Sequence, residues 1–180
     1  MPTFVVLLRG VNVGKAKRVP MADFKALLLE QGCASASTLL NSGNAVVTAP
    51  QRSASALTLK IECAIEARFG FDVPVVVKTA QDLSKIIAGY DEPVDEAMHS
   101  RLVVVFANAP DALTALATLA ERVSPPERFV LGSDAAYLYC ANGILQSKAA
   151  EALLGKAGRS VTTRNWATLL KLNALAQNPR

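Results

Sequence analysis

The residues best suited to chemistry gather near the start of the chain. The first 22 residues contain four basic side chains and no acidic one, and two glycines and an asparagine stand among them. These residues are Arg9, Gly10, Asn12, Gly14, Lys15, Lys17 and Arg18. Cations beside a glycine-rich turn favour anions, because exposed backbone N–H groups and positive side chains attract the same negative charge. A solvated turn between a strand and a helix has the same composition, so an anion site and a plain surface loop both remain open.

The spacing of these glycines excludes a P-loop. That motif has four residues between its glycines and a Ser or Thr after its lysine, which binds magnesium. Here three residues separate Gly10 from Gly14, and Ala16 follows Lys15. Alanine offers no metal ligand, so a nucleoside triphosphatase built on this segment is ruled out.

A second polar segment, Asn41-Ser42-Gly43-Asn44, separates two short apolar runs. Its last three residues could offer hydrogen bonds to a ligand. Hairpin turns select the same residue types, because glycine and asparagine accept the positive φ that a tight turn requires. The turn interpretation is favoured, and the binding interpretation is kept as an alternative.

A third polar segment stands near the end of the chain, where residues 152–180 contain five bases and no acid. We expect its threonines to cap the last helix. Arg164 and Lys171 lie seven positions apart, about two turns, so on that helix they would share a face with Thr168 between them. Together with Asn165, these residues indicate either a ligand contact or a packing contact.

The elements that must position these segments follow from the pattern of apolar residues. In the first half the pattern predicts strands over residues 3–8, 37–40, 45–48 and 73–78, a helix between Pro20 and Gly32, and helices over 53–69 and 79–88. In the second half it predicts strands over 102–106, 128–131 and 137–140, an extended piece at 160–162, helices over 111–122 and 146–154, and a last helix that carries Trp166. Each half therefore has the order β-α-β-β-α-β followed by a helix, which indicates a duplication.

The boundary between the halves is marked by an acidic segment with a proline, residues 91–96. We expect a first half over residues 1–90, a linker over 91–100 and a second half over 101–180.

This topology brings separate segments together. The end of the first strand, the turn between strands two and three and the approach to strand four lie along one edge of a split β-α-β-β-α-β sheet. Residues 9–18, residues 41–44 and Gly70 are therefore expected to be neighbours. Arg164 and Lys171 would complete a site there if the last helix packs near that edge.

Composition limits the classes of function. The chain has 180 residues, a net charge of +4 and 51% hydrophobic residues, which is typical of a well-packed globular protein. Three cysteines without C-x-x-C spacing predict no disulfide framework, and no apolar run is long enough for a membrane span, so we expect a cytoplasmic protein. The single histidine, His99, disfavours a histidine-rich metal site, and we expect no metal. The strands lack the exposed paired aromatics used in base stacking, so nucleic-acid binding is a weak alternative.

Three segments taken together show a family resemblance. They are Leu-Leu-Arg-Gly-Val-Asn-Val-Gly at residues 7–14, Asn-Ser-Gly-Asn at 41–44, and Thr-Arg-Asn-Trp-Ala-Thr-Leu-Leu-Lys-Leu at 163–172, with further similarity at 69–74 and at Ser147-Lys148. This combination resembles the bacterial domain-of-unknown-function family 1697 (DUF1697) over nearly the whole chain. The resemblance implies an α+β fold of two tandem ferredoxin-like halves, each followed by an extra helix, and no established activity. The chain departs from the family pattern at Lys15, where the family tends to have a glycine, and at residues 39–41.

We therefore expect a binder of a small anionic, phosphate-bearing ligand or nucleotide. The residues expected to form its site are Arg9, Gly10, Asn12, Gly14, Lys15, Ser42, Gly43, Asn44, Arg164, Asn165, Thr168 and Lys171. One alternative is an enzyme of group transfer on a phosphorylated or nucleotide substrate, in which Arg and Lys side chains stabilise charge. It has no protein nucleophile beyond Ser42, and its base would have to be His99 or a group of the substrate. The other is a structural or interaction protein whose arginines and asparagines serve interdomain or oligomer packing. The sequence identifies no cofactor and no oligomeric state.

Overall fold

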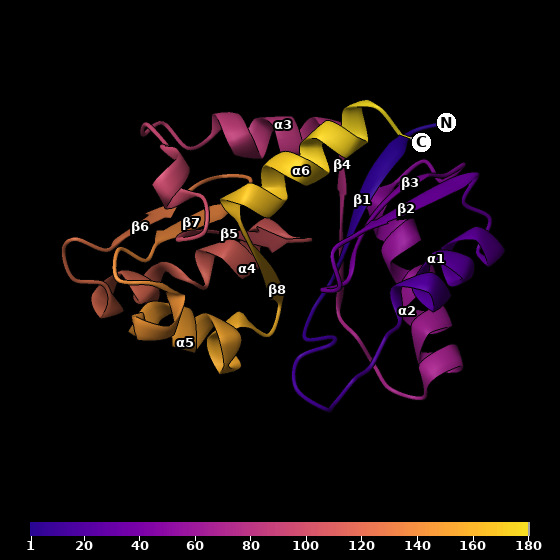
Figure 1. Ribbon diagram of the computed structural model, residues 1–180, viewed down its shortest axis with the longest axis horizontal. Helices are drawn as coiled ribbons and strands as arrows, with labels where there is room; N and C mark the ends of the chain where they lie inside the picture. Colours follow the sequence, from indigo (N-terminus) through magenta and orange to yellow (C-terminus); the bar gives the residue numbers. More distant parts are fainter. Residues whose placement is uncertain (180) are drawn as a thin grey trace. The chain divides into compact units, whose positions relative to one another are not determined.

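The computed structural model describes residues 1–179. Two compact units make up the chain (Figure 1). Unit 1 is Met1–Leu83 with the residues from Leu172 on, and unit 2 is Ser84–Lys171. The helix over residues 80–88 and the last helix therefore each contribute to both units. Each unit holds one four-stranded antiparallel sheet.

Unit 1 has the predicted order of elements. They are β1 (Thr3–Leu8), α1 (Met21–Glu30), β2 (Ser35–Leu39), β3 (Asn44–Thr48), α2 (Ala54–Phe69), β4 (Val75–Thr79) and α3 (Ala80–Ala88). The strand order in the sheet is β2-β3-β1-β4, which places β1 in the interior with β3 and β4 as its antiparallel neighbours. This interior position explains why residues 4–8 are all apolar.

One face of this sheet carries the core of unit 1. Phe4, Val6 and Leu8 of β1 belong to one core cluster with residues of α1 and α2. These two helices cover one face of the sheet (Figure 1). Val5 and Leu7, which alternate with these three residues along β1, are buried as well. Both faces of β1 are therefore shielded from water, which agrees with the apolar side chains at positions 4–8.

The helix ends of unit 1 follow local rules. The Ser53 hydroxyl accepts a hydrogen bond from the Ala56 N–H at the start of α2, and α2 ends at Gly70 in the left-handed conformation. At α3 the Thr79 hydroxyl accepts from the Asp82 N–H, while the Asp82 carboxylate accepts from the Thr79 N–H. Thr79 and Asp82 therefore cap the start of α3 reciprocally, with the residue types and the three-residue spacing of a capping box.

Unit 2 repeats the topology with shorter helices. Its elements are β5 (Leu102–Ala107), α4 (Pro110–Thr114), β6 (Arg128–Leu131), β7 (Ala136–Tyr139), α5 (Lys148–Leu154), β8 (Val161–Asn165) and α6 (Trp166–Gln177), with 3-10 turns η1 (Glu96–Met98), η2 (Ala117–Arg122), η3 (Ile144–Gln146) and η4 (Lys156–Gly158). The strand order β6-β7-β5-β8 matches that of unit 1 position for position. The predicted α+β fold with two tandem ferredoxin-like halves, each followed by a helix, is confirmed.

Three predicted elements of unit 2 are wrong in detail. The helix expected over 111–122 stops after Thr114 and continues as the 3-10 helix η2, because the buried Leu113, Leu116 and Leu119 recur every three residues, the period of a 3-10 helix. The helix expected over 146–154 begins only at Lys148, where Ser147 caps it. The extended piece expected at 160–162 is the strand β8, which pairs with β5 over five residues.

Aromatic side chains cover the second face of the unit 2 sheet. Tyr137 points away from the core that α4 and α5 cover, and its hydroxyl donates to the Ile86 carbonyl at 2.6 Å. The Tyr90 ring contacts both Tyr137 and Trp166, with ring centres 5.2 Å and 5.8 Å away. Burial raises the pKa of Tyr137 to about 12. Trp166 is buried and packs against the Tyr90 ring.

Two glycines allow the energetic cost of a positive φ to be measured separately from the cost of a steric clash at Cβ. Gly43 and Gly70 have nearly equal positive φ angles, +77° and +76°, but a Cβ on Gly43 would lie 2.5 Å from Leu8 Cβ, whereas a Cβ on Gly70 would meet nothing within 4 Å. We predict that Gly70→Ala lowers the free energy of unfolding by about 1–2 kcal/mol and that Gly43→Ala costs about 1–3 kcal/mol more. Urea denaturation of the two variants measures this difference. Equal losses would show that the β2–β3 turn relaxes without cost.

Candidate functional site

The end of β1 is hydrogen bonded to loops on both of its sides. The Leu8 N–H donates to the Gly43 carbonyl at 2.8 Å, and the Arg9 N–H donates to the Pro74 carbonyl at 3.0 Å. The loop after β1, the β2–β3 turn and the approach to β4 are therefore neighbours in unit 1. This confirms the spatial prediction made from the β-α-β-β-α-β topology.

Asn12 closes the loop that follows β1. Its side-chain amide donates to the Val19 carbonyl at 2.8 Å and to the Asn41 carbonyl at 2.9 Å, and its oxygen accepts from the Val19 N–H at 2.9 Å. Its own backbone N–H donates to the Lys17 carbonyl. Asn12 has a φ of +57°, which asparagine tolerates better than most residues do. One side chain thus joins the two ends of the segment 12–19, which we call the clasp loop, and ties them to the β2–β3 turn.

Lys17 fixes the clasp loop on its other side. Its ammonium group donates to the Asp72 carbonyl at 2.6 Å and lies 3.5 Å from the Asp72 carboxylate. Asp72 is an exposed residue of the loop between α2 and β4. The sequence analysis did not single out this contact, although Asp72 lies within residues 69–74, which carry part of the family resemblance.

The tip of the clasp loop presents hydrogen-bond donors to solvent. Residues 13–16 are exposed, and a hydrogen-bonded turn at Gly14 and Lys15 engages the Ala16 N–H. The backbone N–H groups of residues 13–15 donate to no protein acceptor within residues 1–179. In the same part of the chain, the side chains of Lys15 and Arg18 form neither an ion pair nor a hydrogen bond. Left-handed residues at Gly14 and Lys17 bend the tip, and such bends turn successive N–H groups toward one side.

The β2–β3 turn uses its polar side chains internally. Asn44 is fully buried, and its side-chain amide donates to the Leu39 carbonyl at 3.0 Å and to the Ser42 hydroxyl at 2.9 Å. Gly43 is buried against Leu8 with a positive φ. These contacts assign Gly43 and Asn44 to the shape of the turn, as the hairpin interpretation predicts.

Arg9 stands at the base of the clasp loop. Its side chain is half-buried, and burial lowers the pKa of its guanidinium, because withdrawal from water disfavours the charged form. An arginine remains protonated at neutral pH even so. Arg9, Gly10, Asn12, Gly14, Lys15, Ser42, Gly43 and Asn44 therefore lie within one region of unit 1.

The second group of predicted residues belongs to unit 2, and its local structure differs from the prediction. Arg164 lies in β8, not on the last helix, so it does not share a helical face with Lys171. Its guanidinium donates to the Thr162 hydroxyl at 2.9 Å and to the Thr163 carbonyl at 2.7 Å. Burial lowers the pKa of Arg164 to about 10. The strand extends this far because β8 pairs with β5 through residue 165, a contact with no local signal.

The cap of α6 is an asparagine, so the predicted threonine cap is wrong. The Asn165 side-chain oxygen accepts from the Thr168 N–H at 2.9 Å and from the Thr168 hydroxyl at 2.8 Å. Lys171 is exposed farther along the helix. The expectation that this second group completes the anion site of unit 1 stays a prediction.

Neither a metal site nor a membrane-spanning helix is found within residues 1–179. No group of three or more His, Cys, Asp and Glu side chains is arranged to hold a metal ion in that range. In the same range, no helix combines the length and the apolar character that a membrane crossing requires.

The fold defines an α+β protein made of two ferredoxin-like halves. Comparisons with known proteins show the family to which it belongs. The profile of the family described as "Protein of unknown function (DUF1697)" matches residues 1–137, and the chain belongs to this family. The conserved bacterial protein SP0830 from Streptococcus pneumoniae has a similar structure, with a TM-score of 0.78 and 20% sequence identity, over 97% of this chain and 98% of that one. At this identity the similarity concerns the fold. No curated protein sequence matches the chain.

The role of the Asn12 side chain can be tested with a variant that still accepts the positive φ at this position. Asn12→Gly keeps a residue that accepts positive φ but removes the hydrogen bonds to Val19 and Asn41, so we predict a loss of about 1–3 kcal/mol in the free energy of unfolding. Native-state amide exchange at Val19 should become faster. Asn12→Asp keeps the acceptor for the Val19 N–H and should fall between wild type and Asn12→Gly. An unchanged exchange rate in Asn12→Gly would contradict the closing role of Asn12.

The cap of α6 can be tested in the same way. Asn165→Ala removes the acceptor for the Thr168 N–H, and we predict a loss of about 0.5–2 kcal/mol in chemical denaturation. Thr163→Ala is the control, because Thr163 is the residue that local sequence favours as a cap, and it should stay within about 0.5 kcal/mol of wild type. A larger loss of stability in Thr163→Ala than in Asn165→Ala would show that the threonine caps the helix.

Proposed function

We propose that the clasp loop binds a small anionic ligand through a phosphate group. One observation carries the proposal: three successive N–H groups of the exposed residues 13–15 donate to no protein acceptor within residues 1–179 and stand beside the Lys15 side chain, in a loop whose ends are held by Asn12. Backbone donors presented in this way bind phosphate oxygens, and a neighbouring cation strengthens each hydrogen bond. Because the loop is already closed, little conformational entropy is lost when an anion binds.

The residues of this region would have two different roles. Lys15, Arg9 and the N–H groups of the tip would contact the anion. Asn12, Gly43 and Asn44 would position these groups, since their side chains or backbones are committed to contacts inside unit 1. We include Arg164, Asn165, Thr168 and Lys171 as further candidates for the same ligand. We place the function in a reducing cytoplasm, which agrees with the three unpaired cysteines.

A purely structural role is the second candidate, and a specific observation favours it. The side chains of Asn12, Asn44 and Asn165 all satisfy backbone or side-chain partners nearby in the same unit. The family pattern at these positions would then record turn and cap geometry and no ligand.

Group transfer by Ser42 has less support. Ser42 Oγ accepts a hydrogen bond from the side-chain amide of Asn44, which cannot take up its proton as a general base would.

A site-resolved titration distinguishes these candidates. We predict that inorganic phosphate and a nucleoside monophosphate shift the amide NMR signals of residues 13–16 in the ¹⁵N-labelled full chain. Lys15→Gln should weaken this binding about tenfold, as expected for the loss of one charge-assisted hydrogen bond. Lys25→Gln removes an exposed cation of α1 and serves as the control. Saturating phosphate that leaves residues 13–16 unshifted would refute the proposal and favour the structural role.

A further inference from the structure

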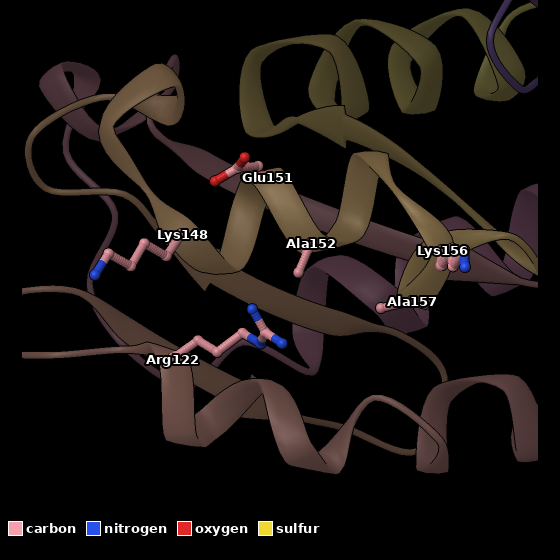
Figure 2. Close-up of a pocket in the computed structure, with 6 residues that line it drawn as sticks. All are labelled: Arg122, Lys148, Glu151, Ala152, Lys156 and Ala157. Atoms are coloured by element: carbon pink, nitrogen blue, oxygen red, sulfur yellow. The ribbon is translucent and has the colours of Figure 1, made fainter.

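Unit 2 contains a cleft with three cations, which the sequence analysis did not single out. The cleft has a volume of about 310 Å³ and is lined by Arg122, Lys148, Glu151, Ala152, Lys156 and Ala157 (Figure 2). These residues come from the end of η2, from α5 and from η4. All of its cations lie outside the clasp loop, which belongs to unit 1.

The shape of the cleft follows from residue spacing. Lys148 and Ala152 stand four positions apart on α5 and therefore share one face of that helix. Lys156 belongs to η4, which begins after the helix has ended at Gly155. The short side chain of Ala152 leaves a hollow between the two lysines. Arg122 reaches toward this hollow from η2, on the other side of the cleft (Figure 2).

The charges of the cleft are not neutralised within the protein. Among the residues that the structure describes, the side chains of Arg122, Lys148 and Lys156 form neither an ion pair nor a hydrogen bond. Glu151 is the one acidic residue of the lining, and its carboxylate is directed away from the Arg122 guanidinium (Figure 2). Three cations against one acid leave the cleft positive, and a binding anion would not have to break an existing ion pair.

The backbone under the cleft is held in place. Ala149, Ala150 and Leu153 anchor α5 in the core of unit 2. Gly158 lies so close to α5 that a Cβ at this position would be 1.7 Å from the Leu153 carbonyl oxygen. This contact fixes η4, and with it Lys156, against the end of α5.

We propose that this cleft binds a short polyphosphate chain, either free or as part of a nucleotide. The ammonium groups of Lys148 and Lys156 point to opposite ends of the cleft, and the Arg122 guanidinium lies between them (Figure 2). In this arrangement a single phosphate beside Arg122 lies away from both ammonium groups, whereas a chain of two or three phosphates spreads its charge along the hollow. Arginine offers paired donors to one phosphate, and each lysine adds a point charge at an end.

The acidic groups that usually hold magnesium on phosphate chains are not part of the lining, since Glu151 stands alone there. The cleft should therefore prefer the metal-free chain, in which the negative charge is not already shared with Mg²⁺.

Isothermal titration calorimetry of the full chain in EDTA tests the proposal. Affinity should rise from inorganic phosphate to pyrophosphate to tripolyphosphate, and excess Mg²⁺ should lower it. The variant Arg122→Gln/Lys148→Gln should bind tripolyphosphate at least about tenfold more weakly. Lys25→Gln/Arg52→Gln removes two exposed cations of unit 1 and should bind as wild type does. ATP compared with tripolyphosphate and adenosine separates a nucleotide from a free chain.

Each contrary result overturns the proposal. Equal loss in the two double variants would show unspecific attraction to positive charge. Loss in Lys15→Gln with full binding in Arg122→Gln/Lys148→Gln would move the site to the clasp loop, which would support the proposed function and refute this inference. Unshifted amide signals at residues 13–16 together with intact binding at the cleft would refute the proposed function and support this inference. Amide shifts at Ala152 and Ala157 report on the cleft, and melting curves confirm that both double variants are folded.

Discussion

The way in which β1 leaves its sheet constrains everything around the candidate site. β1 is an interior strand, and its last backbone donors must find partners on both sides after the regular ladder ends. Leu8 pairs with Gly43 on one side and Arg9 with Pro74 on the other, which brings three loops together. A buried backbone group without a partner costs about 1–3 kcal/mol. The base of the clasp loop is therefore fixed by the same hydrogen bonds that complete the sheet.

Asparagine side chains provide further hydrogen bonds at three places where the chain changes direction. Asn12 joins the ends of the clasp loop, Asn44 holds the β2–β3 turn from within, and Asn165 caps α6. In each case a side-chain amide or its oxygen replaces a backbone partner at a change of chain direction. The groups that we propose to meet a ligand at the clasp loop are the N–H groups of its exposed tip, Lys15 and Arg9.

The two proposed anion sites rest on different donors. The clasp loop offers fixed backbone N–H groups and one cation at its tip, an arrangement that suits the oxygens of one compact anion. The cleft of unit 2 offers side-chain cations spaced along α5 and η4 over a floor of alanines, an arrangement that suits a charge spread over several groups. Both sites depend on a close backbone approach, at Gly43 against Leu8 in unit 1 and at Gly158 against Leu153 in unit 2.

The sequence by itself determined the order of elements in both halves, the Thr79–Asp82 cap and the edge at which the clasp loop lies, because these depend on local periodicity and on the rules of one topology. Only the tertiary structure decided that Arg164 belongs to a strand, since the pairing of β8 with β5 outweighs the local preference for a helix start. It also decided that Asn12 contacts Asn41, 29 positions away, and that Arg122 and Lys148 line the same cleft. Contacts between distant positions leave no periodic signal in the chain, because they depend on how packed elements are arranged in space.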